Sequence, residues 1–443
     1  MKLKVGQTIR VGFAFFSICA FWQMYNTVIP LILTNTFNLN ETISGAIMAA
    51  DNVLALFLLP FFGSLSDRNK SKMGRRKPFI LFGTIAAVIL MILLPLVDNS
   101  YYVNPSVAKE ALFIGVLGCL LVAMGTYRSP AVALMPDVTP KPLRSRGNAI
   151  INLMGALGGI LYLGISAVLY SKAKTQGLPH VNYVPIFVII AGVMLVALCI
   201  VMITVDEVKL SKEVEEYEAA HPEENLMEDD GSGDAVLPPA VKRSLVFLLI
   251  SIALWFISYN AVETWFSTFA NHMWNMSLGE ASTCLLVANA GAILSYIPIG
   301  FIAAKIGRKK TILGGVCLMT LAFLISFIYT FTIAAFSVFL YILFFIVGMS
   351  WAAINVNSLP MVLEMCKGSD IGKFTGYYYT FSMAAQIVTP IVAGWLLEHV
   401  GYVTLFIYAA IFMGLAFATM QFVRHGDSKE ITKRGLEAFD VDD

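Results

Sequence analysis

Three ionisable side chains, Asp51, Arg128 and Glu263, interrupt long apolar stretches of the sequence. In apolar surroundings, such groups can form ion pairs, bind and release a proton, or bind a polar solute. A charge at the centre of a lipid bilayer costs about 2.5–3.5 kcal/mol even on the mildest scale. Each of the three is therefore a functional candidate if its stretch spans a membrane.

Helical geometry places two of these side chains at similar depths. At about 1.5 Å per residue, Asp51 lies roughly 14 Å below the outer start of its stretch and Arg128 roughly 12 Å above the inner end of its own. In a hydrocarbon core about 30 Å thick, their Cα levels differ by about 4 Å. We expect them to interact, either as a coupling pair or as a static brace.

Glu263 has no cation at comparable depth in its own half of the chain. This favours Glu263 as a proton carrier, because functional carboxyl groups are often held in such surroundings. It is also open to a structural role, as a hydrogen-bond donor to a neighbouring helix, or to a direct role as a ligand of a solute hydroxyl. The candidate proton-coupling residues are thus Glu263, Asp51 and Arg128.

Amide and aromatic side chains recur at helical spacing within five of the same stretches. They supply the hydrogen bonds and flat apolar faces that suit an uncharged sugar. Helix packing in membranes uses the same residue types, so packing remains the alternative for each one. The candidate substrate-binding residues are Gln23, Asn26, Asn148, Asn152, Trp255, Tyr259, Asn260, Glu263, Trp351, Asn355, Tyr379 and Gln386.

Composition defines the elements that must position these residues. Of the 443 residues, 58% are hydrophobic and 13% are charged. Continuous apolar runs of about 20 residues, the length that crosses a bilayer, recur along the chain and favour helices over a barrel of alternating strands. We expect an all-α membrane protein with twelve transmembrane helices. The expected spans are residues 11–34, 42–66, 78–97, 111–136, 149–170, 183–205, 244–270, 281–304, 311–331, 334–362, 374–397 and 402–423.

Positive charges predict the orientation of these helices. With the N-terminus inside, 26 of the 30 Lys and Arg residues fall in cytoplasmic segments, and the external loops hold only Lys109, Lys172 and Lys174. The first apolar run is longer than a signal peptide and has no A-x-A cleavage site, so we expect it to remain as the first span. The protein is expected in the cell (plasma) membrane, multi-pass, with both termini cytoplasmic.

Residues 206–241 separate two groups of six spans. The segment carries twelve Asp or Glu residues and is predicted to be a solvated linker with a short helix over 206–220. The loops Gly63–Lys77 and Gly300–Lys310 resemble each other, which indicates two parallel repeats with a binding site at their interface. The expected domains are an N-terminal six-helix bundle (1–205), the linker (206–241), a C-terminal six-helix bundle (242–424) and a cytoplasmic tail (425–443).

The first of these loops resembles the motif G-x-L-x-D-R-x-x-x-x-x-G-R-R-K of the major facilitator superfamily. The resemblance implies a transporter that works by alternating access, in which the acidic and basic residues hold the cytoplasmic gate shut. The second loop has Ala304 in place of Asp67, so we expect a weaker cluster there. The residues assigned to the gate are Gly63, Asp67, Arg68, Gly74, Arg75, Arg76, Asp137, Arg144 and Arg146.

Three segments carry a narrower resemblance, to the sucrose-transporter-like branch of the glycoside–pentoside–hexuronide:cation symporters. They are GRRKPFI (74–80), RSPAVALMPDVTPKPLRSRGNA (128–149) and AVETWFSTFA (261–270). The resemblance implies a sugar substrate and a coupling ion. Sodium symporters of that family carry several carboxylates in helices one, two and four, whereas these helices offer only Asp51 at depth here. With so few hard oxygen ligands, a proton is favoured over sodium.

These patterns predict a secondary active transporter, a proton-coupled symporter of a di- or oligosaccharide or glycoside such as sucrose or maltose. A multidrug or metabolite exporter, a proton antiporter on the same fold, is the alternative and predicts a greasier cavity. The two-half repeat argues against a channel, and the sequence has no histidine–cysteine cluster or phosphate-binding loop typical of an enzyme. We expect no cofactor or metal, no nucleic-acid partner, and a monomer whose partners are the sugar and the bilayer.

Overall fold

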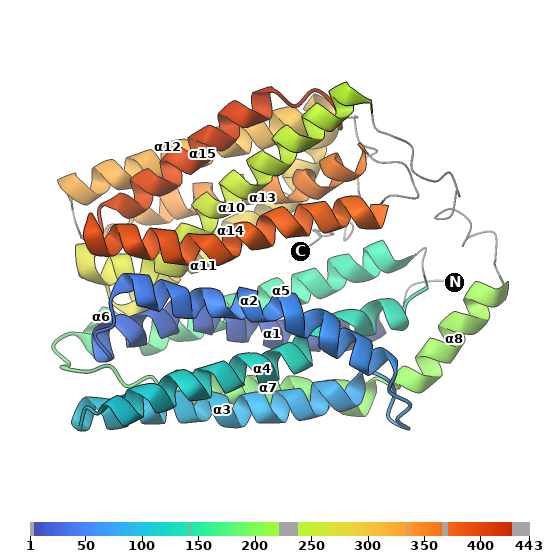
Figure 1. The fold of residues 1–443 in the computed structure, drawn as a ribbon, viewed down its shortest axis with the longest axis horizontal. Helices are drawn as coiled ribbons and strands as arrows, with labels where there is room; N and C mark the ends of the chain where they lie inside the picture. The colour runs from blue at the N-terminus through green and yellow to red at the C-terminus, as the bar shows by residue number, and fades with distance from the viewer. Residues whose placement is uncertain (1–3, 141–142, 221–237, 334, 366–370, 428–443) are drawn as a thin grey trace. The chain divides into compact units, whose positions relative to one another are not determined.

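The computed structural model describes residues 4–140, 143–220, 238–333, 335–365 and 371–427. All regular structure among these residues is helical, and twelve of the helices are long and apolar enough to cross a membrane, as predicted (Figure 1). Six precede the linker: α1 (Val5–Leu31), α2 (Glu41–Asp67), α3 (Lys77–Val103), α4 (Val107–Asp137), α5 (Arg144–Leu169) and α7 (Val184–Thr204). Six follow it: α10 (Pro239–Trp274), α11 (Leu278–Ile306), α12 (Arg308–Thr332), α13 (Phe339–Leu363), α14 (Ile371–His399) and α15 (Thr404–Gln421).

Several helix ends differ from the predicted spans; for example, α1 begins at Val5 and α13 at Phe339. A short π-helix, η1 (Ile32–Thr36), extends α1. Helix α3 continues to Val103 instead of ending near residue 97, so the polar residues from Asp98 onward are still helical. Asp98 therefore lies inside a helix, where the sequence pattern indicated a loop.

The chain divides into two compact units by its contacts. Unit 1 comprises residues 1–40, 50–222 and 277–279, and unit 2 comprises residues 41–49, 223–276 and 280–443. The sequence assigned all of 1–205 to one bundle. The start of α2 groups instead with unit 2, where the backbone N–H of Thr42 donates a 3.2 Å hydrogen bond to Glu398.

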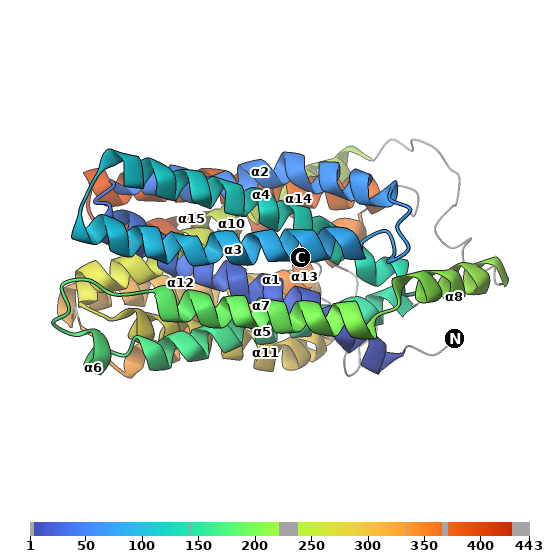
Figure 2. The same cartoon turned by 90° about the horizontal axis from the view of Figure 1, so that it is seen from below.

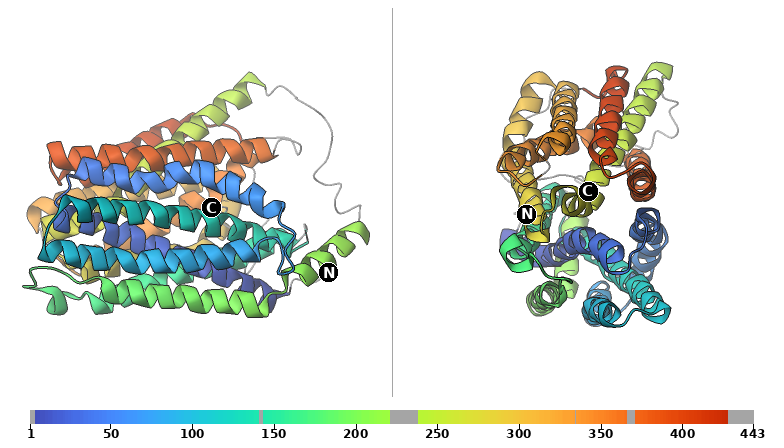
Figure 3. Two further views of the ribbon diagram at one scale, coloured as in Figure 1. Left: turned by 60° about the horizontal axis from the view of Figure 1, so that its bottom comes forward. Right: turned by 90° about the vertical axis from the view of Figure 1, so that its left-hand side faces the viewer.

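Within unit 1, α1 packs along α5, and α3 packs against both α4 and α7. Gly158 permits the close approach of α1 and α5, because an added Cβ there would lie 2.0 Å from the carbonyl oxygen of Phe16. Within unit 2, α10 packs against α14 and α15, and α12 against α13 and α15. Figure 3 shows the long helices of each unit lying roughly along a common axis.

Two short helices lie at opposite ends of unit 1 (Figures 1 and 2). Helix α6 (Lys172–Thr175) follows α5, and α8 (Glu207–Ala220) follows α7. Helix α8 matches the short helix predicted at the start of the linker. It is amphipathic, and it buries Glu207, Leu210 and Val214. Residues 221–237 of the predicted linker lie outside the described residues.

Candidate functional site

Asp51 and Arg128 belong to one cluster within unit 1. The guanidinium carbon of Arg128, on α4, lies 5.7 Å from the centre of the Trp22 ring on α1, within cation–π range. Oδ1 of Asp51, on α2, accepts a 3.0 Å hydrogen bond from Nδ2 of Asn52. Arg128 acts electrostatically on Asp51, but no ion pair joins the two among the described residues. Asp51 and Arg128 therefore interact electrostatically, as expected, without a direct ion pair among the described residues.

Two buried hydrogen-bond donors adjoin this pair. The Tyr25 and Trp22 rings meet edge to face with centroids 5.3 Å apart. The Tyr25 hydroxyl and the Trp22 Nε1 are both buried without a hydrogen-bond partner in the described part of the chain. Asp51 also acts electrostatically on Tyr25. The sequence stripe named Gln23 and Asn26 on α1 and missed these two aromatic neighbours, which lie one position earlier on the helix.

The predicted amides of unit 1 are all half-buried. Gln23 and Asn26 lie on α1, and Asn148 and Asn152 lie on α5, the helix that packs along it. Asn148 and Asn152 each interact with another group in the structure. Nothing in their geometry separates substrate binding from helix packing, so their role stays a prediction.

In unit 2, two predicted residues form an aromatic platform. The rings of Tyr259 (α10) and Trp351 (α13) stack with centroids 3.9 Å apart and an angle of 9° between their planes. Phe256 contacts Trp351 edge-on at 5.4 Å. The amide nitrogen of Asn260, beside Tyr259 on the chain, is buried without a hydrogen-bond partner in the described residues. Unit 2 thus combines a stacked pair of aromatic rings with a buried spare donor one residue along α10.

The other predicted residues of unit 2 divide by exposure. Four of them, on α10, α13 and α14, are half-buried: Glu263, Asn355, Tyr379 and Gln386. Trp255 is fully buried and belongs to the packed interior of unit 2.

Glu263 is not isolated, because the structure gives it an interaction with another group. Its role as a proton carrier stays a prediction, which rests on its depth in the apolar stretch.

Arg76 is the centre of the predicted gate cluster. Its side chain is 6% exposed, pairs with Asp67, and donates a 2.7 Å hydrogen bond from Nε to Asp137 at the end of α4. It also hydrogen-bonds Ser66 and the Gly63 carbonyl. Burial opposes ionisation, but the hydrogen bond and charge of Asp137 and the charge of Asp67 raise the pKa of Arg76. The guanidinium is thus held charged by two carboxylates of the same unit.

The other predicted gate arginines have different surroundings where the structure describes them. Arg68 and Arg75, which the resemblance assigned to the gate, are exposed. Nε of Arg144 donates a 3.2 Å hydrogen bond to the Thr139 carbonyl. The side chain of Arg146 lies outside the described residues.

Glu207 completes the cluster and was missed by the sequence reading. The residue is 2% exposed, and its carboxylate accepts hydrogen bonds from the backbone N–H groups of Arg75 at 2.6 Å, Arg76 at 2.9 Å and Lys77 at 3.0 Å. These are the unpaired donors at the start of α3, where a negative charge also meets the positive end of the helix dipole. Gly74 reaches this turn with φ of +110°, a conformation that favours glycine.

Unit 2 has a matching arrangement at the start of α12. Arg308, also buried, pairs with Glu364 just after α13. The Lys309 N–H donates a 2.8 Å hydrogen bond to Asp427. The weaker cluster predicted from Ala304 therefore has its own carboxylate partners, from positions that the motif does not include.

A second buried acid, Asp98, lies at the opposite end of unit 1 from Arg76. It is fully buried, and its Oδ2 lies 3.5 Å from Nε2 of His180. The same Nε2 lies 2.8 Å from Oδ1 of Asn99, whose Nδ2 donates to Asn182 at 2.9 Å. The ring of Tyr102 stacks on His180 at 4.4 Å. Sequence reasoning missed this group because it placed Asp98 in a loop.

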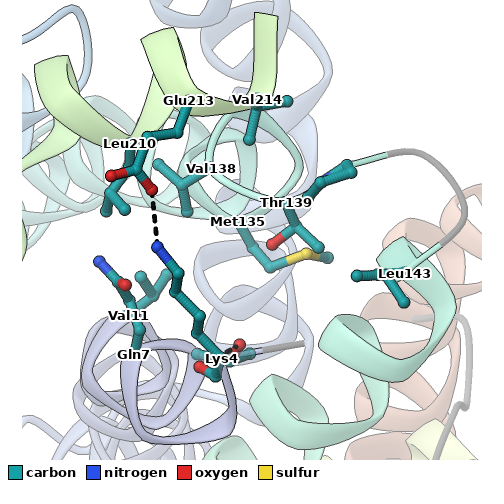
Figure 4. A pocket seen from close by; sticks show the side chains of 12 residues that line it. Lys4, Gln7, Val11, Met135, Val138, Thr139, Leu143, Leu210, Glu213 and Val214 are labelled. Atoms are coloured by element: carbon teal, nitrogen blue, oxygen red, sulfur yellow. Dashed lines mark hydrogen bonds and ion pairs between the residues drawn. The ribbon is translucent and has the colours of Figure 1, made fainter. Parts of the chain in front are cut away.

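A small cavity lies between α8, the start of α1 and the end of α4 (Figure 4). Its volume is about 30 Å³, and Lys4 closes it through a 2.6 Å ion pair with Glu213. A buried water needs about 10–15 Å³, so this space is large enough for water and far too small for a sugar. Among the described residues no group of three or more His, Cys, Asp or Glu is placed to hold a metal.

The fold and the buried charged clusters define a multi-pass membrane transporter. The sequence model of the Major Facilitator Superfamily matches residues 11–275 and 269–440. The chain belongs to this superfamily, whose members are transporters and not enzymes.

Curated relatives match only parts of the chain. It is 32% identical over 144 residues to the sucrose transport protein SUC3 of Arabidopsis thaliana, covering 30% of this chain and 24% of that protein. It is 26% identical over 205 residues to the putative glycoside/cation symporter YagG of Escherichia coli, covering 45% of this chain and 42% of that protein. These matches span less than half the length of either relative. The predicted resemblance to sucrose and glycoside symporters is confirmed at this low identity.

The fold matches solved transporters over nearly its whole length. The inward open conformation of the xylose transporter XylE from E. coli aligns with a TM-score of 0.65 and 14% identity, covering 97% of both chains. At this identity the match establishes the fold alone.

Proposed function

We propose that the chain is a proton-coupled sugar symporter of the cell membrane with both termini in the cytoplasm. The observation that carries the substrate class is the stacked pair of Tyr259 and Trp351, together with the amide nitrogen of Asn260, which has no hydrogen-bond partner in the part of the chain that the structure describes. Flat aromatic faces and amide donors are the groups that suit a sugar ring. The names of the matched relatives, a sucrose transporter and a glycoside/cation symporter, support the same class.

Asp51 is the better candidate for the proton carrier. A direct ion pair with Arg128 would hold the carboxylate ionised and make it a poor carrier. The described geometry leaves Asp51 hydrogen-bonded to Asn52 and outside any ion pair. A group that must load and release a proton during each cycle needs this freedom.

The proposal is tested by uptake of labelled sugars into proteoliposomes that contain the purified chain. An inward proton gradient at equal sodium should drive concentrative uptake, and a sodium gradient at equal pH should not. Sodium-dependent uptake that ignores pH would contradict the coupling. Transport of many apolar cations in place of sugars would instead identify the multidrug or metabolite exporter.

The aromatic platform gives a residue-level test of the substrate class. Trp351→Ala should weaken sugar affinity by up to about tenfold, the scale of a lost aromatic contact of roughly 0.5–1.5 kcal/mol. Trp395→Ala is the matched control, because Trp395 on α14 is 47% exposed and stacks on His399. Equal sugar affinity in both variants would remove the platform from the site.

A pair of isosteric variants separates the two candidate carriers. Asp51→Asn should abolish concentrative uptake and retain sugar–sugar exchange, because exchange does not require release of the proton. Glu263→Gln should then retain proton-driven accumulation. The reverse pattern would make Glu263 the carrier.

A further inference from the structure

The backbone of Arg128 is anchored between α1 and α2. The hydroxyl of the preceding residue, Tyr127, donates a 2.8 Å hydrogen bond to the carbonyl of Ala14 on α1. The hydroxyl of the following residue, Ser129, donates a 2.8 Å hydrogen bond to the carbonyl of Leu59 on α2. Both neighbouring helices therefore hold α4 at this point, and the long side chain of Arg128 is the part that can change its partner.

Two groups compete for this side chain. The guanidinium carbon lies 5.7 Å from the centre of the Trp22 ring on α1. Arg128 also acts electrostatically on Asp51 of α2, although no ion pair joins the two among the described residues. The other polar groups that interact with Asp51 are Tyr25 on α1 and Asn52 on α2 itself. Among the described residues, Arg128 is thus the cation that faces Asp51.

The observed arrangement is the one expected when Asp51 carries a proton. At an effective dielectric constant of about 20, opposite charges about 4 Å apart attract each other roughly twice as strongly as a desolvated cation–π pair. An ionised Asp51 would therefore draw Arg128 away from the ring. A neutral Asp51 can still accept the hydrogen bond of Asn52, as observed, and it leaves Arg128 on Trp22.

We propose that Trp22 is a positioning residue for proton coupling, whose ring binds the guanidinium of Arg128 while Asp51 is protonated. The inference rests on the proposed proton symport with Asp51 as the carrier. When Asp51 releases its proton to water, Arg128 keeps its own protons and moves from the ring to the new carboxylate. Proton uptake by Asp51 reverses the exchange. The guanidinium has a partner in both states, which a cation at this depth requires.

The Trp22 ring is held in place by its neighbours on α1. The rings of Phe21 and Tyr25 meet it edge to face, with centroids 5.1 and 5.3 Å away. Its indole N–H is buried without a hydrogen-bond partner in the part of the chain that the structure describes. Replacing the ring therefore breaks no hydrogen bond among those residues. Of the aromatic side chains, Trp also attracts a cation most strongly.

The exchange makes proton binding by Asp51 depend on Trp22. The contact between the ring and Arg128 stabilises the protonated site only, because Arg128 leaves the ring when the proton leaves. Without the ring, Asp51 should lose its proton at a lower pH. A contact of about 1.4 kcal/mol corresponds to a shift of about one pH unit.

The experiment is an infrared titration of the purified full chain in lipid, without sugar, over a series of pH values. The band of a protonated carboxyl group that is missing in Asp51→Asn reports the proton on Asp51. This band is present below the midpoint and disappears as the pH rises through it. In Trp22→Leu the midpoint should fall by about one pH unit. A midpoint that is unchanged or higher would overturn the proposal.

Three further variants assign the shift to the contact with Arg128. Trp22→Phe keeps a weaker ring and should shift the midpoint by less than Trp22→Leu, which also covers a poorly folded Trp22→Leu. Phe21→Leu removes the adjacent ring, which makes no cation–π contact among the described residues, and should shift nothing. In an Arg128→Gln background, adding Trp22→Leu should have no further effect. An equal shift in both backgrounds would overturn the proposal.

Uptake of labelled sucrose into proteoliposomes with the same variants separates this inference from the proposed function. The pH at which uptake is half-maximal should fall with the infrared midpoint in Trp22→Leu, and sucrose affinity at acidic pH should not change. Proton-driven uptake by the wild type with an unshifted midpoint in Trp22→Leu would refute the role of Trp22 alone. Wild-type uptake that ignores pH would refute the proton symport itself. Weaker sucrose binding with an unshifted midpoint would make Trp22 a sugar ligand instead.

Discussion

Glu207 offers a sharp test of the structure, because sequence reasoning placed it in a solvated linker. The structure buries it and gives it three backbone N–H groups at the start of α3. Each hydrogen bond to a charged group contributes a net stabilisation of about 1.5–3 kcal/mol, and each buried donor left without a partner costs about 1–3 kcal/mol.

Two substitutions at this position should differ in size. Glu207→Gln keeps one acceptor oxygen but loses the charge, so we expect a loss of about 2 kcal/mol in the free energy of unfolding. Glu207→Ala leaves all three donors unpaired and should cost at least about 3 kcal/mol. The measurement is reversible unfolding of purified protein in mixed micelles of increasing SDS content.

Asp427 provides the control within the same chain. It caps the Lys309 N–H in unit 2, but it is exposed and accepts from one backbone group. Asn serves nearly as well as Asp in such a cap, so Asp427→Asn should cost only a few tenths of a kcal/mol, roughly the spread among good capping residues. If both Glu207 variants unfold within about 0.5 kcal/mol of wild type, a margin typical of surface substitutions, the buried cap is refuted.

Two further predictions concern buried charges of unit 1. Asp137→Asn should lower the free energy of unfolding by about 3 kcal/mol, because it breaks a mostly buried ion pair with Arg76. The side chain of Asp67 is 58% exposed, so Asp67→Asn should lower it by less than about 1 kcal/mol. Equal losses for the two variants in SDS unfolding would contradict this order. Burial lowers the pKa of His180, so its neutral form favours folding, and stability should fall as the pH drops below about 6.5, the unfolded value. His180→Gln should remove that loss in melting curves taken at several pH values, whereas a wild type that gains stability on acidification would show that the ion pair with Asp98 dominates instead.

The spans could be predicted from the sequence because the bilayer imposes a length and a polarity on every crossing segment. Depth arithmetic also placed Asp51 and Arg128 in one neighbourhood, since a helix converts residue number directly into height. It could not show whether the two side chains touch. That depends on how helices rotate and pack, and in the structure Arg128 lies against Trp22 instead.

The average polarity of a segment gave a wrong prediction for single residues that are buried although the segment around them is polar. Glu207 begins a strongly acidic segment, and average polarity predicted solvent exposure for all of it. Asp98, Asn99 and Ser100 end an apolar run, so the pattern predicted the end of a helix. Both acids are buried because another element supplies their partners. Such pairings join residues 80 or more positions apart and leave no local signal.

The two repeats keep the same kinds of contact although the residues of their motifs differ. Arg76 pairs with the acid that ends α4, and Arg308 pairs with the acid just after α13. The ammonium group of Lys77 hydrogen-bonds the last carbonyls of α7, and that of Lys309 hydrogen-bonds those at the end of α15. The helix starts are capped by an acid in each case.

The repeated feature is therefore a spatial arrangement of donors and acceptors, and Ala304 in place of Asp67 removes only its most exposed member. Because the described partners of each arginine belong to its own unit, each cluster first braces one bundle. A gate residue should accordingly be judged by how its loss changes the stability of its own unit as well as by how it changes transport.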